Sequence, residues 1–128
     1  MKKKLIFKAV FPIGDTNVLQ LPVPHLDDAI HYYEENLGFV LKEKKEGAPV
    51  AAILRRDAVE IGLIENGGDP WQHSCYFQVS DLYALYEEFK AKPALDLSGI
   101  KDIKDEHGQY RAFFIRDADG LCYCVGEV

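Results

Sequence analysis

Three polar residues stand inside apolar, alternating segments of this sequence, where they are well placed to bind a small molecule. They are Gln20, Glu60 and Gln78. Side chains on a β-strand point to opposite faces in turn, so a polar residue opposite the core can orient a ligand. A sheet face that is wetted by solvent or covered by a second subunit carries the same residues. The pattern therefore predicts either a ligand-binding groove or an ordinary open sheet face.

Two aromatic residues and one arginine extend this candidate groove. Tyr76 lies two residues before Gln78 and shares its face. Trp71, the only tryptophan, precedes the same segment, where its ring either stacks on a flat ligand or anchors a loop. Arg111 lies at the start of an aromatic strand and either pairs with an anionic ligand group or is a surface arginine. The residues expected to line the groove are Gln20, Glu60, Trp71, Tyr76, Gln78 and Arg111.

No segment has the spacing of a catalytic site. Cys122 and Cys124 are two residues apart on one strand, about 6–7 Å, which is too far for an unstrained disulfide, so we expect inert thiols. His25, His31 and His107 lie in separate segments with no converging carboxylates or hydroxyls. Phosphate-binding glycine loops and nucleophile elbows are also missing from the sequence. We therefore predict no catalytic residue.

The elements that must position the groove residues occur twice. Residues 19–23 and 75–79 alternate in the manner of half-buried strands. An amphipathic helix follows each, over residues 26–37 and 82–89. The first has acidic residues in its opening turn and Gly38 just past its end, which are start and stop signals. The same strand and helix therefore recur in each half of the chain.

A hairpin closes each copy. The turn at residues 56–58 corresponds to the turn at residues 116–118, each between apolar strands. Residues 66–70, Asn-Gly-Gly-Asp-Pro, separate the copies. We predict one α+β domain over residues 1–128, built from two tandem βαβββ modules at about 15–66 and 71–128, with a curved mixed sheet and a concave groove. Residues 1–14 alternate and form either an edge strand or a dimer arm.

This order of elements resembles the vicinal oxygen chelate superfamily, which includes glyoxalase I, extradiol dioxygenases and bleomycin-resistance proteins. The resemblance covers residues 15–128 and is carried by three stretches. They are residues 23–39 with Tyr32-Tyr33, residues 77–89 with Phe77-Gln78-Val79, and the aromatic strand and turn from Tyr110 to Gly120. In that turn, Ala118 stands where the family has proline.

The resemblance also implies four metal-ligand positions, which are His, Gln or Glu in the metal-dependent members. They fall here on Val18, Gly62, Ser74 and Cys124. Valine and glycine offer no ligand, and a serine with a single thiolate does not supply the three or more protein ligands a divalent ion needs. We therefore expect no metal and no cofactor. His73 and Glu60 lie nearest and would be the first suspects if a metal site had been misplaced.

Composition excludes several classes of partner. The net charge of −6 leaves no basic excess for nucleic acid, and no apolar run approaches the roughly 20 residues of a membrane span. Lys8 and Pro12 interrupt the start too early for a signal peptide, and three cysteines suit a reducing compartment, so we expect a cytoplasmic protein.

As the resemblance to bleomycin-resistance proteins implies, we predict a metal-free homodimer that sequesters a small, partly aromatic molecule and confers antibiotic resistance. One alternative is a metal-dependent lyase, isomerase or dioxygenase of the same superfamily. The other is a structural or regulatory module whose own side chains fill the groove.

Overall fold

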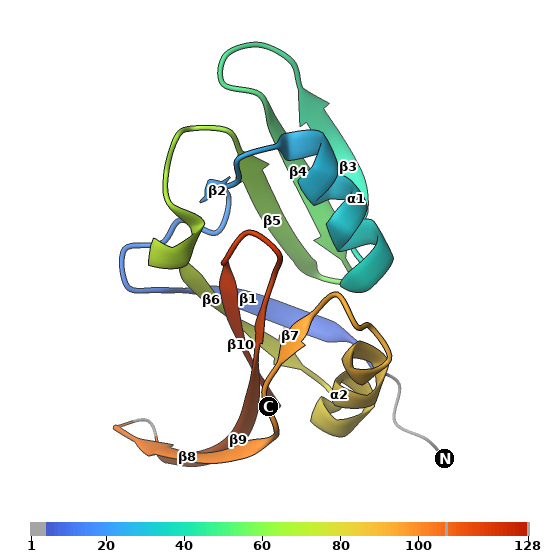
Figure 1. The fold of residues 1–128 in the computed structure, drawn as a ribbon. Coiled ribbons are helices and arrows are strands. Elements are labelled where there is room, and N and C mark those ends of the chain that lie inside the picture. Colours follow the sequence, from blue (N-terminus) through green and yellow to red (C-terminus); the bar gives the residue numbers. More distant parts are fainter. Residues whose placement is uncertain (1–4, 107, 128) are drawn as a thin grey trace.

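The computed structural model describes residues 5–106 and 108–127, and each half of the chain forms its own sheet with one helix against it (Figure 1). The first module is a four-stranded sheet in the order β2-β5-β4-β3. Its elements are β2 (Leu21–Pro22), α1 (Leu26–Asn36), β3 (Val40–Lys45), β4 (Ala51–Arg56) and β5 (Val59–Ile64). β2 runs parallel to β5, and the other neighbours are antiparallel.

The second module repeats this plan in a six-stranded sheet with the order β1-β6-β10-β9-β7, in which β8 also pairs with β9. Its own elements are the short 3-10 helix η1 (Pro70–Gln72), β6 (Ser74–Val79), α2 (Leu82–Lys90), β7 (Asp96–Leu97), β8 (Lys101–Asp105), β9 (Gly108–Arg116) and β10 (Cys122–Glu127). β6 is parallel to β10, as β2 is to β5. The predicted α+β fold of two tandem modules is confirmed, with two sheets in place of one.

A strand that precedes the first module, β1 (Phe7–Ile13), is built into the sheet of the second module, antiparallel to β6. Its start is tied to both modules. The Phe7 amide donates to Asp57 Oδ2 at 2.8 Å, in the β4–β5 turn. The Ser80 amide, at the end of β6, donates to the Ile6 carbonyl at 2.9 Å. β1 therefore joins the two halves of the molecule.

The helices begin and end at the signals that the sequence contains. α1 has Asp27 and Asp28 in its first turn, and Gly38, just beyond its end, has a φ of +74° that favours glycine. The Asp81 side chain caps α2 by accepting a hydrogen bond from the Ala84 amide at 3.1 Å. Within the described residues, no helix combines the length and the apolar character needed to cross a bilayer.

Alternation along the strands separates a core face from an open face in each sheet. On β6, Cys75, Phe77 and Val79 are completely buried, while Ser74 and Tyr76 are half-buried on the other face. In Figure 1 both helices lie toward the right of the molecule, and β8 sweeps out to the left. The core therefore lies between helices and sheets, and the opposite sheet faces remain open to ligands or partners.

Residues 17–20 depart from the prediction. Leu19, Leu21 and Val23 were expected to pack as one strand, but Leu19 is 51% exposed while the other two are buried. The Leu19 amide donates to Asn17 Oδ1 and the Gln20 amide to the Asn17 carbonyl, both at 2.9 Å. This turn ends the alternation before Leu21, because asparagine side chains readily close such turns. β2 is consequently only two residues long.

Candidate functional site

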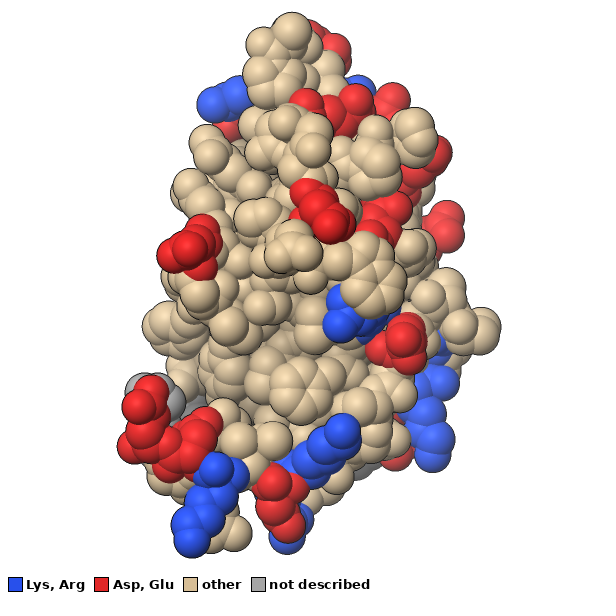
Figure 2. All heavy atoms as spheres, turned by 60° about the vertical axis from the view of Figure 1, so that its left-hand side comes forward, with Lys and Arg blue, Asp and Glu red and all other residues tan. Residues whose placement is uncertain are grey.

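The open face of the second sheet curves into a hollow of about 750 Å³. Four aromatic side chains from three strands form much of its lining: Phe11, Tyr76, Tyr110 and Phe114. The other lining residues are Ile13, Asp105, Cys124 and Glu127. The volume is that of a small-molecule pocket, which typically holds about 300–1,000 Å³. Figure 2 shows the left-hand side of Figure 1, where a broad middle region carries few charged side chains.

The two carboxylates named in the lining of this hollow are both hydrogen-bonded to the protein. The Tyr110 hydroxyl donates to Asp105 Oδ2 at 3.0 Å, and Glu127 Oε2 accepts from the Leu82 amide at 3.0 Å. Among the residues that the structure describes, the lining includes no Lys or Arg, although Lys101 Nζ lies 5.8 Å from the centre of the Phe114 ring. Glu127 caps the start of α2 on the helix side of the sheet, so Asp105 is the carboxylate of the lining that faces the hollow, and it favours a neutral or positively charged ligand over an anion.

The weakly acidic side chains of the hollow hold their protons at neutral pH. Burial raises the pKa of Cys124 to about 11 and that of Tyr110 to about 12. Burial also raises the pKa of Tyr76 above its ordinary value. A protonated thiol is a poor nucleophile, and protonated phenols are hydrogen-bond donors. The lining can therefore hold a ligand by apolar contact, ring stacking and hydrogen bonds, and it contains no activated nucleophile.

The open face of the first sheet is partly covered by backbone. The Gly62 amide donates to the Val18 carbonyl at 2.9 Å, and the Leu19 carbonyl occupies the space where a side chain at position 62 would begin. A smaller depression of about 230 Å³ remains beside Gln20 and Ile53. The two modules thus share a strand order but differ in how much open space they offer a ligand.

The four positions implied as metal ligands do not fit a metal ion. Val18 and Gly62 bind each other through the backbone and offer no ligand side chain. Ser74 and Cys124 offer only a hydroxyl and a protonated thiol, short of the three or more ligands that a protein zinc site needs. Within residues 5–106 and 108–127, no three His, Cys, Asp or Glu side chains gather closely enough to hold an ion.

The two residues first suspected as displaced ligands have other partners. His73 Nδ1 is 3.4 Å from Thr16 Oγ1, in the loop before β6. Glu60 Oε2 is 2.7 Å from Lys42 Nζ, and this lysine lowers the pKa of the Glu60 carboxyl. His73 and Glu60 therefore do not combine into a ligand set.

Of the six residues predicted to line a groove, the structure brings two to the open face of the second sheet. Tyr76 lines the hollow, and Gln78, next on the same face of β6, pairs with Gly126 of β10. Gln20 and Glu60 belong to the first module, Gln20 beside the smaller depression and Glu60 in its ion pair.

Trp71 and Arg111 lie outside the hollow. The Arg116 guanidinium lies 4.2 Å from the centre of the Trp71 ring and covers one of its faces, which fits the loop-anchor alternative. Arg111 Nη1 donates to the Tyr83 hydroxyl of α2 at 2.5 Å, on the helix side of the sheet. Because Arg111 neighbours Tyr110 on β9, alternation turns the two side chains to opposite faces.

Sequence reasoning missed three of the four rings, Phe11, Tyr110 and Phe114. Tyr110 and Phe114 are separated by four residues on one strand and so share a face, which the alternation alone could have indicated. Phe11 was part of a visible alternating segment, but the partner of that segment, β6, was not apparent from the sequence.

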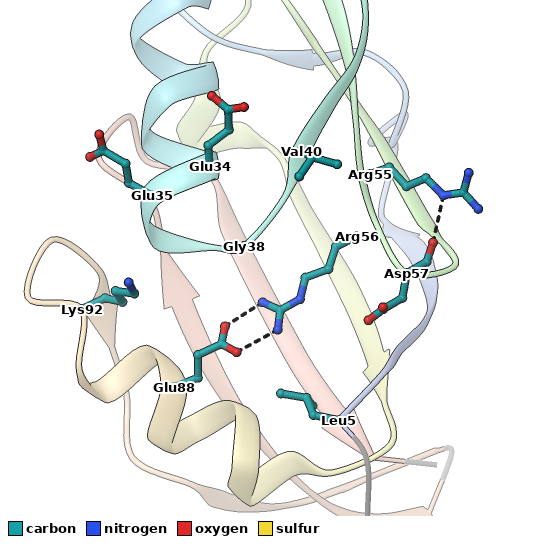
Figure 3. A pocket seen from close by; sticks show the side chains of 10 residues that line it. All are labelled: Leu5, Glu34, Glu35, Gly38, Val40, Arg55, Arg56, Asp57, Glu88 and Lys92. Atoms are coloured by element: carbon teal, nitrogen blue, oxygen red, sulfur yellow. Dashed lines mark hydrogen bonds and ion pairs between the residues drawn. The ribbon is translucent and has the colours of Figure 1, made fainter.

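A second depression, of about 470 Å³, lies on the helix side between the modules (Figure 3). Arg56 Nη1 and Nη2 donate to the Glu88 carboxylate at 2.7 and 2.8 Å, and Nη1 also donates to the Leu37 carbonyl at 2.7 Å. The guanidinium carbon lies 4.4 Å from the centre of the Phe7 ring. Arg56 of the first module and Glu88 of the second therefore already bind each other. We interpret this depression as a junction between the modules and not as a ligand pocket.

Comparison with known proteins matches residues 16–124 to the Glyoxalase/Bleomycin resistance protein/Dioxygenase superfamily, which confirms the resemblance found in the sequence. A search of curated proteins finds no match. Many solved structures are similar in fold, among them the following three. A bleomycin resistance determinant encoded on the transposon Tn5 has a TM-score of 0.70 and 21% identity, covering 89% of this chain and 98% of its own.

The second is the bleomycin-binding protein of Streptomyces verticillus complexed with copper(II)-bleomycin, with a TM-score of 0.68 and 20% identity over 88% of this chain and 94% of its own. The third is TnmS3, an antibiotic binding protein from Streptomyces sp. CB03234, with a TM-score of 0.69 and 16% identity over 90% of this chain and 98% of its own. At these identities the likeness is one of fold.

Proposed function

We propose that this chain, which belongs to the Glyoxalase/Bleomycin resistance protein/Dioxygenase superfamily, sequesters a small, partly aromatic molecule in the hollow of its second module without a metal ion. The observation that carries the proposal is the hollow itself, about 750 Å³ with four aromatic rings in its lining. Burial of apolar surface and ring contacts bind such a molecule tightly. Sequestration requires no catalytic group, in keeping with the protonated thiol and phenols of the lining.

The charge of the site supports a neutral or cationic ligand. Asp105 lies in the lining beside the Tyr110 hydroxyl, and the whole chain carries a net charge of −6. Two of the structures with a similar fold bind bleomycin or confer resistance to it, and a third is an antibiotic binding protein. An antibiotic or a comparable aromatic compound is therefore the first class of ligand to test.

We also propose a cytoplasmic homodimer in which the open faces of two copies meet. β3 is exposed along its whole length, with Val40 61% and Leu41 40% exposed. On the open side, Phe11 and Leu19 are 48% and 51% exposed. A second copy would bury such apolar surface and close the hollow. Analytical ultracentrifugation should give twice the 14.5 kDa chain mass, and a monomer at micromolar concentration would contradict the dimer.

Calorimetric titration with bleomycin and a panel of flat aromatic cations tests the ligand-binding function. We expect the unaltered protein to bind at least one of them, and Tyr76→Ala to weaken that binding about tenfold, because stacking and burial are lost together. Tyr83→Ala is the matched control, since Tyr83 is 49% exposed but lies on α2, away from the hollow. Equal affinities of Tyr76→Ala and the unaltered protein would exclude the hollow as the site, and no binding across the panel would count against the function itself.

The rival function, a metal-dependent lyase, isomerase or dioxygenase, makes the opposite prediction for metal content. Elemental analysis of protein purified without chelators should find only traces of divalent metal, because positions 18, 62, 74 and 124 offer too few ligands. One ion per chain, lost in a Glu60→Gln or His73→Ala variant, would instead establish the enzyme.

A further inference from the structure

β1 lies outside the part of the chain that matches the superfamily, yet it helps to line the hollow. The match begins at residue 16, whereas Phe11 and Ile13 of β1 are both lining residues. In the pairing of β1 with β6, Phe11 is opposite Tyr76 and Ile13 is opposite Ser74. One side of the hollow is thus supplied by a segment that precedes the matched region.

The apolar side chains at the end of β1 are not buried in the core, so packing of the core does not explain why they are apolar. Phe7, at its start, is completely buried, but Phe11 is 48% exposed and Ile13 is 43% exposed. Exposed apolar residues on an edge strand favour unwanted pairing with other chains, and Pro12 between them limits such pairing because it has no amide proton. Because Phe11 and Ile13 both line the hollow, a ligand bound there covers these two exposed apolar side chains.

The start of β1 is firmly held, so Phe11 is presented from a rigid element. The Ile6 amide donates to Ser80 Oγ at 2.7 Å, and the Phe7 amide donates to Asp57 Oδ2 at 2.8 Å. The Arg56 guanidinium covers the Phe7 ring. None of these contacts involves Phe11. A ring fixed in this way binds without a large ordering cost.

We propose that β1 is a selectivity wall and that Phe11 makes the hollow prefer flat aromatic ring systems over saturated molecules of the same size and charge. β1 and β9 lie on opposite sides of β6 and β10 in the sheet, so Phe11 and Phe114 form opposite walls of the hollow. The Phe11 and Tyr76 ring centres are 6.2 Å apart with planes inclined by 40°, which leaves ring surface open to a ligand. A flat ligand can lie face to face against the exposed Phe11 ring, whereas a puckered one has no flat face to offer it. This inference rests on the proposed function, since it requires the hollow to be the binding site.

Fluorescence titration with proflavine, a flat tricyclic cation, and calorimetry with dicyclohexylamine, a saturated cation, test the wall. We expect the unaltered protein to bind proflavine more tightly than dicyclohexylamine. Phe11→Ala should weaken the binding of proflavine about tenfold, equivalent to about 1.4 kcal/mol. The same variant should change the affinity for dicyclohexylamine less than about twofold. Phe11→Tyr should retain proflavine binding, and Tyr83→Ala, equally exposed on the helix side, should leave both ligands unchanged.

Three outcomes would overturn the selectivity wall: unchanged proflavine binding in Phe11→Ala, equal loss of both ligands, or no preference for proflavine in the unaltered protein. Tyr76→Ala separates this failure from failure of the proposed function. If Tyr76→Ala loses the ligand while Phe11→Ala keeps it, the hollow remains the site and only the role of β1 is wrong. If both variants keep it, the hollow is not the site. Thermal unfolding of Phe11→Ala close to that of the unaltered protein shows that the fold is intact.

Discussion

The two modules share one strand order but make different use of their open faces. In the first, the turn at residues 17–20 lies across Gly62, and its backbone fills the position where a side chain would start. In the second, where Cys124 corresponds to Gly62, the space above the nearby Gly126 is taken by the hydroxyl end of the Tyr76 ring, a side chain that can move. Backbone thus closes the open face of the first sheet, whereas an aromatic side chain lines the open face of the second. The strand order that the two modules share therefore places an open sheet face in each, and the segment that covers this face decides whether a ligand site forms there.

The largest expected effect comes from adding a methyl group at these two glycines. Gly62→Ala should lower the free energy of unfolding by about 3 kcal/mol, because the Leu19 carbonyl cannot move without disrupting the turn. Gly126→Ala should cost only about 1 kcal/mol, since the Tyr76 ring can rotate away. Urea denaturation measures the free energy of unfolding of both variants. Equal losses in Gly62→Ala and Gly126→Ala would contradict the difference between a face covered by backbone and one covered by a side chain.

The next effect tests how far the modules depend on each other. The buried Tyr33 hydroxyl of α1 donates to Asp117 Oδ2 at 2.5 Å and lies 2.6 Å from the Tyr123 hydroxyl, so it links the first module to the second. Tyr33→Phe should cost about 2 kcal/mol, because it removes a partner from buried polar groups.

Tyr32→Phe is the matched control, since the Tyr32 hydroxyl donates to the Ala94 carbonyl at an exposed position. It should cost less than about 1 kcal/mol. If Tyr33→Phe costs no more than this control, the buried link contributes little to holding the modules together.

A smaller effect is expected from pH, through the buried carboxyl of the second module. Burial raises the pKa of Asp117 above its ordinary value of 3.8. As pH rises above 3.8, the unfolded carboxyl loses its proton before the folded one does, so this residue's contribution to stability falls. The free energy of unfolding of Asp117→Asn, measured from pH 3 to 7, should lack this decline. If the free energy of unfolding depends on pH in the same way in both proteins, the role of Asp117 is contradicted.

The smallest effect belongs to the exposed carboxyl of the first module, with the opposite sign. Lys42 lowers the pKa of Glu60 below its ordinary value of 4.5, so the stability it contributes is present above pH 4.5 and is lost as pH falls through the folded pKa. Because the pair is exposed, Glu60→Gln should be inseparable from the unaltered protein at pH 7. A clear loss of stability at pH 7 would show that this ion pair matters more than its exposure suggests.

The sequence correctly indicated the features that depend on short-range signals. The acidic first turn of α1, Gly38 as a helix stop and the alternation around Phe77 each act within a few residues. The alternation failed at Leu19, where Asn17 closes a turn. Arg111, one of the residues expected in the groove, donates to Tyr83 on the helix side, and the rings of Phe11, Tyr110 and Phe114 were missed. These misses concern the site, and the fold does not depend on them.

By itself, then, the sequence determined the two tandem modules and the signals that begin and end their helices, because periodicity and capping are local properties. Only the tertiary structure decided where a ligand can bind. The hollow exists because β1 pairs with β6 and because β9 curves across from it, which brings Phe11, Tyr76 and Phe114 to one place. Contacts between segments so far apart along the chain depend on strand pairing and register, and nothing in the local pattern of any one segment specifies them.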